Sequence, residues 1–458
     1  MKRRQLLAMT SALPILGRAA GSRALRDRAY SQAERTLPNE DERTAWYRDA
    51  KFGMFIHWGP YSLASVEASW PIMRPSKEFP ITEQKYRSLP QQFNPTQFDP
   101  NALVALARST GQRYMVFTTK HHDGFCMFDS AYTDYKVTDT PYKQDIVAQL
   151  ATACHQANMP IGFYYSPPDM NHPAFRDTSQ PASNNWNGEP TREVWPLYLS
   201  YMEMQLRELL TRYGDVALIW FDGLYNQRKF DGYRMHRAIL DVQPRALINN
   251  RIGIPGDFET PEQFLPASIP IKGKTLDFDH RETGSKPGYV PSHEEFRLWE
   301  TCMTINHTWA YNKNDRDFKS ARQLIRTLVE VASRGGNFLL NVGPGPDGTV
   351  QPEFVARLNA VGKWMDRNGE GIYGTTYGPI QGLAPVRTTA KGDVVFVHVF
   401  DWPGTSLGLA VDGLPHFRSA SLLASGQPLK FRQESHSLTI ELPAQAPDAD
   451  ATVIKMAP

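Results

Sequence analysis

The feature that most restricts the fold of this chain is a series of short apolar runs separated by longer helical candidates. The runs cover residues 51–58, 113–119, 160–165, 216–222, 246–250 and 337–342. Runs of this kind are typical of strands buried on both faces, as in a parallel sheet. Helical segments are predicted at 101–109, 145–157, 195–213, 318–333 and 352–367. The alternation predicts an α/β fold with a (β/α)8-like barrel, and an open doubly wound sheet is the alternative.

The last part of the chain has a different pattern. Short β-rich runs at 394–399, 407–411, 419–424, 438–442 and 451–455 follow one another without a long helix. They predict a small C-terminal antiparallel β-sandwich over residues 377–458, after a barrel over residues 25–376. Residues 25–43 are expected to form a linker or a leading helix.

The start of the chain has the pattern of an export signal. Lys2, Arg3 and Arg4 precede a short apolar stretch at 6–17, and small residues follow at 19–22. This pattern predicts a cleaved signal peptide over residues 1–24, with paired arginines that suit twin-arginine export. The expected location is the bacterial periplasm or the extracellular space, and a disordered basic tail is the alternative. No later stretch has the length and hydrophobicity of a membrane span, so stable membrane insertion is not expected.

The composition narrows the classes of partner. The chain has 50 basic and 48 acidic residues, and no basic block stands out, so no nucleic-acid partner is expected. Aromatic residues make up 11% of the chain. That content suits either a large aromatic core or a cleft that stacks on sugar rings.

Residues whose side chains can take part in catalysis or binding lie at the ends of several predicted strands. They occur in HWG from His57, KHHDGF from Lys120, YYS from Tyr164, WFDG from Trp220 and NNR from Asn249. In a barrel, active-site residues project from these carboxyl ends.

Two simpler interpretations of these strand ends remain open. Asp222 shares a strand face with Trp220, but an Asp at this place can also cap the next helix. His57, His121, His122 and Asp222 could also be metal ligands. Zinc-dependent barrel hydrolases usually carry two histidines two positions apart on the first strand, and here that strand offers only His57.

The motifs taken together resemble a known family. HWGPYS, KHHDGF, GFYYS, WFDG, NNR, GDFETPEQ and WETCMTIN, followed by LLNVGPGPDG and GEGIYG, occur in the order found in α-L-fucosidases of glycoside hydrolase family 29. The resemblance covers roughly residues 45–375 and implies a retaining exo-glycosidase that acts on fucosylated oligosaccharides or glycoconjugates. It implies no metal and no other cofactor.

The resemblance also implies roles for individual residues. Asp222 corresponds to the nucleophile, and Arg251 is expected near the acid/base region. The remaining residues implied in sugar binding are His57, Trp70, His121, His122, Tyr164 and Trp220. Many family members carry a Glu-Trp pair where this chain has Glu67-Ala68-Ser69-Trp70, so a role for Glu67 stays open.

The general acid/base is the least certain role, because the family places it in a variable loop. Glu262 is the first candidate, and Glu259 and Glu300 are alternatives. Two other functions stay open: a non-catalytic glycan-binding protein on the same barrel, and a glycosidase that acts on another sugar. The fucosyl linkage, broad or restricted to α1,3/α1,4, also stays open.

Overall fold

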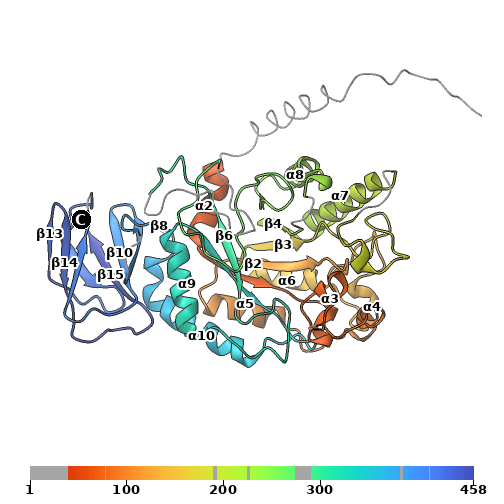
Figure 1. Ribbon diagram of the computed structural model, residues 1–458, viewed down its shortest axis with the longest axis horizontal. Coiled ribbons are helices and arrows are strands. Elements are labelled where there is room, and N and C mark those ends of the chain that lie inside the picture. Colours follow the sequence, from red (N-terminus) through yellow and green to blue (C-terminus); the bar gives the residue numbers. More distant parts are fainter. Residues whose placement is uncertain are drawn as a thin grey trace, which may run out of the picture. The chain divides into compact units, whose positions relative to one another are not determined.

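The computed structural model describes residues 40–77, 79–188, 193–223, 227–273, 290–381, 385–411 and 413–458. The predicted signal peptide lies outside these residues. A parallel sheet lies at the centre of the fold (Figure 1). It has seven strands in the order β5-β4-β3-β2-β1-β7-β6. The strands are β1 Phe52–Ile56, β2 Met115–Lys120, β3 Ile161–Tyr165, β4 Leu218–Phe221, β5 Leu247–Ile248, β6 Glu300–Thr304 and β7 Asn337–Val342.

Every one of these strands is buried along its whole length. Strand β4 shows why. Leu218 and Trp220 pack inside the curled sheet with Tyr164, whereas Ile219 and Phe221 belong to the core under the surrounding helices. Because both faces of each strand are covered, their residues form the continuous apolar runs seen in the sequence.

An extended segment fills the space between β5 and β6. Residues 257–263 make parallel bridges to both sides, through Asn249 to Phe258, Glu259 to Trp299 and Glu262 to Cys302. This segment connects the two edge strands of the curled sheet. The (β/α)8-like barrel expected from the sequence is thereby confirmed.

The helices begin at residues that suit their amino ends. Asp99 and Asp145 accept hydrogen bonds from the first backbone amides of α5 and α6, and Ser320 forms a capping box with Gln323 at α9. The helices are α2 Glu40–Ala50, α3 Trp70–Met73, α4 Glu83–Arg87, α5 Pro100–Ser109, α6 Ile146–Gln156, α7 Trp195–Arg212, α8 Gly232–Leu240, α9 Ala321–Ser333 and α10 Pro352–Asn368. Among the described residues, no helix is both long and apolar enough to cross a lipid bilayer.

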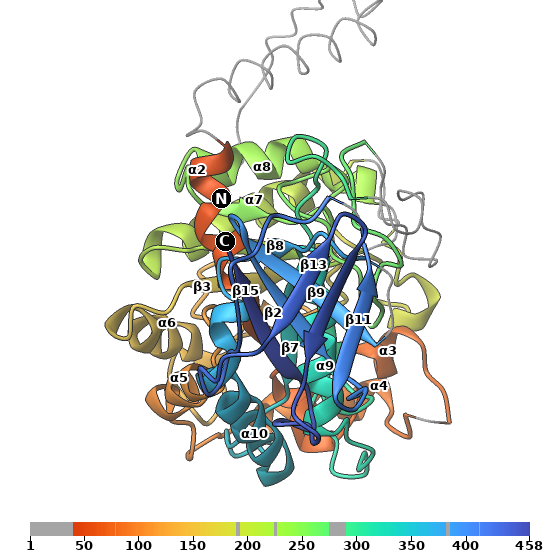
Figure 2. The same cartoon turned by 90° about the vertical axis from the view of Figure 1, so that its left-hand side faces the viewer.

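Two antiparallel sheets form the C-terminal part (Figure 2). Their strands are β8 Thr376–Tyr377, β9 Val386–Lys391, β10 Val394–Val399, β11 Ser406–Ala410, β12 Ser419–Leu422, β13 Phe431–Glu434, β14 Ser437–Glu441 and β15 Thr452–Ala457. One sheet has the order β12-β15-β10-β9-β8 and the other β11-β14-β13, and both contribute to a separate apolar core. The predicted antiparallel β-sandwich is confirmed.

The barrel and the sandwich share buried contacts. Trp364 of α10 donates a hydrogen bond from Nε1 to the carbonyl of Ala451, at 2.9 Å. Phe396 and Val453 of the sandwich belong to the main apolar core of the barrel. The sandwich therefore covers apolar surface that the barrel helices would otherwise expose.

Candidate active site

A cavity of about 130 Å³ opens beside the carboxyl ends of the parallel strands. Its lining includes all the site residues predicted from the sequence except Tyr164: His57, Trp70, His121, His122, Trp220, Asp222, Arg251 and Glu262. Tyr164 lies directly behind the lining, where its hydroxyl donates to Oδ2 of Asp222 at 2.8 Å. The curled sheet therefore brings residues from five strand ends into one site.

Asp222 follows β4 and has three polar neighbours. Arg251 donates to Oδ1 at 2.9 Å, Tyr164 donates to Oδ2, and Nε2 of His122 lies 3.5 Å from the same Oδ2. The Asp222 side chain is 17% exposed. The carboxylate is thus fixed in orientation while it still faces the cavity.

Arg251 joins Asp222 to Glu262. The Nη1 atom of Arg251 lies 2.9 Å from Asp222 and 2.9 Å from Glu262. The Asp222 oxygen and the Glu262 oxygen that accept these two bonds therefore cannot be farther apart than twice that distance. This limit is below ~6.5 Å, the smallest separation of the two carboxyl groups in inverting enzymes. Thr260 holds the rest of the guanidinium, through its hydroxyl to Nε at 2.9 Å and its carbonyl to Nη2 at 2.8 Å.

The two carboxyl groups have pKa values shifted in opposite directions. Burial alone would raise the pKa of Asp222, but the charge of Arg251 and the Tyr164 hydrogen bond outweigh it and lower that pKa. Burial raises the pKa of Glu262, and the negative charge of Asp222 adds to this against the opposing effect of Arg251. Asp222 is thus easier to ionise, and Glu262 harder to ionise, than an ordinary carboxyl group.

Hydrogen bonds set the tautomer of two histidines. The Asn341 amide donates to the carbonyl of Trp309 at 2.6 Å, so its oxygen accepts from Nδ1 of His57 at 2.7 Å. In the same way, Ser166 donates to the carbonyl of Pro168, and its oxygen accepts from Nδ1 of His122 at 2.5 Å. With the proton on Nδ1, each neutral ring leaves Nε2 as an acceptor.

The three histidines of the cavity are neutral near pH 7. Burial lowers the pKa of His57 to about 4, and it also lowers the pKa values of His121 and His122. Nδ1 of His121 is hydrogen-bonded to the hydroxyl of Ser69. Neutral imidazoles suit the binding of uncharged hydroxyl groups.

The alternative acid/base residues lie elsewhere. Glu259 is 3% exposed and forms an ion pair with Arg297 at 3.2 Å. Glu300 is fully buried beneath Trp220, whose Nε1 donates to it at 3.0 Å. Neither residue lines the cavity, whereas Glu262 does and has a side chain that is 31% exposed.

Glu67 has a place near the cavity but does not line it. Its two carboxylate oxygens accept from the backbone amide of Trp309, at 2.9 and 3.0 Å. Trp309 in turn lines the cavity, and its ring centroid lies 4.9 Å from that of His57. Glu67 therefore fixes one wall of the site.

Several residues of the site were not predicted from the sequence. Asn341 stands near the end of a predicted strand, so the rule that led to Asp222 could also have found it. Trp186 and Trp309 line the cavity from loops that carry no periodic pattern. No sequence signal distinguishes these two tryptophans from core residues.

The metal interpretation can be tested against the geometry. One ligand atom each from His121, His122 and Asp222 lies within 4.8 Å of the others. The Arg251 guanidinium already binds Asp222, and its positive charge disfavours a second cation at that carboxylate. The donor set therefore suits polar substrate groups better than a metal ion.

Comparisons with known proteins agree on one family. The family model described as Alpha-L-fucosidase matches residues 19–370. The human plasma alpha-L-fucosidase is 29% identical over 426 residues, which cover 87% of this chain and 85% of the human protein.

Two solved structures are also similar. Alpha-L-fucosidase isoenzyme 1 from Paenibacillus thiaminolyticus has a TM-score of 0.79 and 34% identity, and the match covers 91% of this chain and 99% of that one. A trapped covalent intermediate of a GH29 alpha-L-fucosidase from Bacteroides thetaiotaomicron has a TM-score of 0.76 and 28% identity. The match covers 92% of this chain and 97% of that one.

Proposed function

This chain belongs to the alpha-L-fucosidase family and is a glycoside hydrolase of family 29; from that premise we propose a retaining mechanism with two named carboxyl groups. Asp222 is the nucleophile and Glu262 is the general acid/base. The substrate is a glycan that carries a terminal α-L-fucosyl group. The observation that carries this proposal is the opposite pKa shift of two carboxyl groups bound to one arginine nitrogen.

In the first step, an oxygen of ionised Asp222 attacks the anomeric carbon of the fucosyl group. The bond from that carbon to the leaving oxygen breaks, and protonated Glu262 transfers its proton to this oxygen. The products are the free carrier glycan and a fucosyl ester of Asp222. The lowered pKa of Asp222 keeps the nucleophile charged, and the raised pKa of Glu262 keeps the proton available.

In the second step, the roles of Glu262 reverse. Glu262 is now a carboxylate and removes a proton from water, whose oxygen attacks the anomeric carbon. The ester bond breaks, Asp222 is released as a carboxylate, and Glu262 is protonated again. Two displacements at the same carbon give overall retention of configuration.

The histidines contribute selectivity for the sugar. His57 and His122 each present Nε2 as an acceptor, so each can take a hydrogen bond from a fucose hydroxyl. A sugar that lacks a hydroxyl at either place would leave a buried nitrogen unpaired, which costs binding. The ring of Trp220 lies beside Tyr164 in a stacked arrangement and offers an apolar surface to the sugar.

The first test is hydrolysis of 4-nitrophenyl α-L-fucoside by the wild type and by Asp222→Gly, each with and without azide. We expect hydrolysis by the wild type, its loss in the variant, and partial recovery with azide, because the small anion takes the place of the carboxylate. Asp41→Gly, which alters an exposed carboxylate of α2, is the control and should hydrolyse normally.

If the wild type cleaves neither the aryl fucoside nor branched fucosylated oligosaccharides, the chain is a non-catalytic glycan-binding protein. Cleavage of the oligosaccharides alone would indicate an enzyme restricted in linkage. Faster cleavage of another aryl glycoside would assign a different sugar.

We also propose that the chain is exported, on the basis of Lys2, Arg3, Arg4 and the apolar stretch that follows. In a bacterial host, fractionation should recover a shortened chain in the periplasm or the medium. Arg3→Lys combined with Arg4→Lys should retain the chain in the cytoplasm if export uses the twin-arginine route. Unchanged export of the double variant would indicate a general secretory signal.

A further inference from the structure

A buried ion pair joins the end of β2 to the loop that follows β3, and the two displacement steps do not use it. Nζ of Lys120 lies 3.1 Å from Oδ2 of Asp169. The two side chains are 0% and 1% exposed. Burial alone would lower the pKa of Lys120, but the negative charge of Asp169 raises it above its ordinary value. A buried ion pair is weak evidence for stability, because both groups lose their water, so its position beside the site calls for another explanation.

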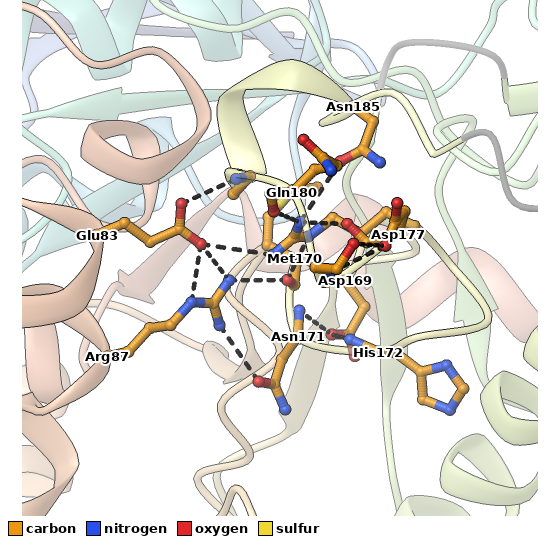
Figure 3. Close-up of polar contacts among 12 residues, drawn as sticks. Glu83, Arg87, Asp169, Met170, Asn171, His172, Asp177, Gln180 and Asn185 are labelled. Carbon is orange, nitrogen blue, oxygen red and sulfur yellow. Dashed lines mark hydrogen bonds and ion pairs between the residues drawn. The ribbon is translucent and has the colours of Figure 1, made fainter.

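Both oxygens of the Asp169 carboxylate have partners. Oδ2 binds Lys120, and Oδ1 accepts from the backbone amides of Asn171 at 2.9 Å and His172 at 3.0 Å (Figure 3). A Cβ atom at Gly124, which has a φ angle of +80°, would meet Oδ1 of Asp169 at 2.1 Å. The motif KHHDGF therefore supplies both the lysine that binds this carboxylate and the glycine that leaves room for it.

The next residue, Met170, is held through its backbone. Its amide donates to the carbonyl of His122 at 2.8 Å. Its own carbonyl accepts from Arg176 at 2.7 Å and from Arg87 at 3.0 Å (Figure 3). Arg176 is 1% exposed, so this carbonyl has a buried donor. The loop after β3 is thus bound directly to the backbone of a histidine that lines the cavity.

A chain of hydrogen bonds leads from the same loop to the ring of His122. The carbonyl of Pro168, in the peptide bond shared with Asp169, accepts from the hydroxyl of Ser166 at 2.7 Å. The oxygen of Ser166 accepts from Nδ1 of His122 at 2.5 Å. A hydroxyl has one proton to donate, and Ser166 gives it to Pro168, so the ring proton has to be on Nδ1. The position of the Pro168 carbonyl therefore decides which nitrogen of His122 is the free acceptor.

We propose that Lys120 and Asp169 are positioning residues that fix the tautomer of His122. The inference rests on the proposed function, in which Nε2 of His122 accepts from a fucose hydroxyl. Lys120 anchors Asp169, and the peptide bond between Pro168 and Asp169 is held with it. When the anchor is lost, the hydroxyl of Ser166 is free to donate to Nδ1 instead, and the ring proton then moves to Nε2.

The tautomer matters because Nε2 of His122 faces two groups. It accepts from the sugar in the proposed function, and it lies 3.5 Å from Oδ2 of Asp222. A proton on Nε2 would remove the acceptor that the sugar hydroxyl needs. It would also donate toward Asp222, and a carboxylate stabilised by a further hydrogen bond is a weaker nucleophile. A ring proton fixed on Nδ1 therefore favours both sugar binding and the attack by Asp222.

The first experiment reads the tautomer directly. In protein with ¹⁵N-labelled histidine rings, the nitrogen signals distinguish a protonated from an unprotonated nitrogen, and the signals that are absent from His122→Phe belong to His122. At neutral pH this ring is uncharged, because burial lowers its pKa. We expect a proton on Nδ1 alone in the wild type. In Asp169→Asn and in Lys120→Met, the proton should be shared with Nε2 or moved to it.

Two further variants separate positioning from stability. Each single substitution leaves one buried charge without its partner, which destabilises the fold. The double variant Lys120→Met/Asp169→Asn removes both charges and should fold with the altered tautomer. Lys51→Met is the matched control, because Lys51 is also a lysine that is 1% exposed, and its Nζ donates to the carbonyl of Gly335 at the amino ends of the strands, at 2.9 Å. It should change neither the His122 signals nor kcat/KM.

Kinetics then tests whether the tautomer acts on the reaction. With 4-nitrophenyl α-L-fucoside, we expect the double variant to lower kcat/KM about tenfold relative to the wild type. When the same two substitutions are added to His122→Phe, kcat/KM should change by less than about twofold, because the ring on which they act is absent.

Each result has a separate meaning. An unchanged His122 tautomer in the folded double variant would overturn the positioning role, whatever its activity. Equal losses of kcat/KM with and without the His122 ring would also overturn it, because the ion pair would then act on another group. A wild type that cleaves neither the aryl fucoside nor branched fucosylated oligosaccharides would overturn the proposed function, whereas the ring signals would still support or overturn the positioning of His122.

Discussion

At the scale of single residues, one arginine nitrogen joins the two carboxyl groups of the proposed mechanism. Arg251 is 1% exposed and donates from Nη1 to both Asp222 and Glu262. It lowers both pKa values, but Asp222 also accepts a hydrogen bond from Tyr164, whereas burial and the negative charge of Asp222 raise the pKa of Glu262. The difference between the two carboxyl groups therefore comes from their other neighbours.

These shifts predict a bell-shaped dependence of kcat/KM on pH. Activity should fall on the acid side as Asp222 becomes protonated, below its usual pKa, and on the alkaline side as Glu262 loses its proton, above its usual pKa. Glu262→Gln should remove the alkaline limb for 4-nitrophenyl α-L-fucoside and lower kcat/KM by roughly 10²–10⁴-fold for glycan substrates. An alkaline limb that persists in Glu262→Gln would assign the acid to another group.

A second prediction at this scale concerns Asn341, which sets the His57 tautomer. Asn341→Leu leaves Nδ1 of His57 without its acceptor, so the ring no longer presents a fixed acceptor to the sugar. We expect kcat/KM to fall about 10–100-fold, which corresponds to about 1–3 kcal/mol for a buried unpaired group. Asn368→Leu is the control, because the amide of this buried asparagine donates to the carbonyl of Trp364 within α10 and the residue does not line the cavity, so activity should be retained.

At the scale of elements, the strands that could be predicted are those whose faces are both apolar. The six predicted runs contain β1 to β5 and β7, apart from Lys120 at the end of β2. Strand β6 was missed because Glu300, Thr301 and Thr304 interrupt its apolar pattern, although all three are buried. These polar groups can be buried because they pair with residues far away in the sequence. Glu300, for example, accepts a hydrogen bond from Tyr114, and a local sequence pattern does not contain such a partner.

The segment that carries Glu262 was harder to predict for a related reason. Residues 257–263 lie between β5 and β6 through isolated bridges rather than a regular ladder. Pro261 has no amide hydrogen, and Phe258 is the one large apolar residue in the segment DFETPEQ, so the segment has no strand signal. The candidate Glu262 came from the resemblance, and the geometry shows why Glu259 points elsewhere, toward Arg297.

Glu300 gives a stability prediction for β6. Burial raises the pKa of Glu300 to about 7, above its usual value near 4.5. A raised carboxyl pKa means that the folded state binds the proton more tightly, so this contribution to stability is lost as pH rises through about 7. The Tm of the wild type should therefore fall between pH 5 and pH 8 relative to that of Glu300→Gln. A constant difference in Tm over this range would contradict the prediction.

At the scale of the whole molecule, the sandwich is part of the barrel's core. Phe396, Ala451 and Val453 pack in the same apolar cluster as Trp364. The sequence predicted both parts from their different periodicities, but it could not show this shared core. The division of the chain at residues 376 and 377 stays a prediction.

The shared core predicts that the described barrel and sandwich unfold together. Trp364→Ala should destabilise both by about 3–5 kcal/mol, because it removes a buried indole that is 1% exposed. Urea unfolding followed by far-UV circular dichroism and by tryptophan fluorescence should give coincident transitions. Tyr132→Ala, an exposed position, should leave the midpoint unchanged. Two separated transitions in the wild type would show that the parts fold independently.

In the proposed mechanism, the shared nitrogen of Arg251 has a consequence for the whole catalytic cycle. Before the first step, the pair of carboxyl groups carries one negative charge, on Asp222. In the covalent state the charge is on Glu262, and the total is unchanged. Because Arg251 contacts both groups, its counterion moves from one side of the guanidinium to the other without leaving it. The site therefore conserves its net charge through both displacements, and little dipolar reorganisation has to accompany either one.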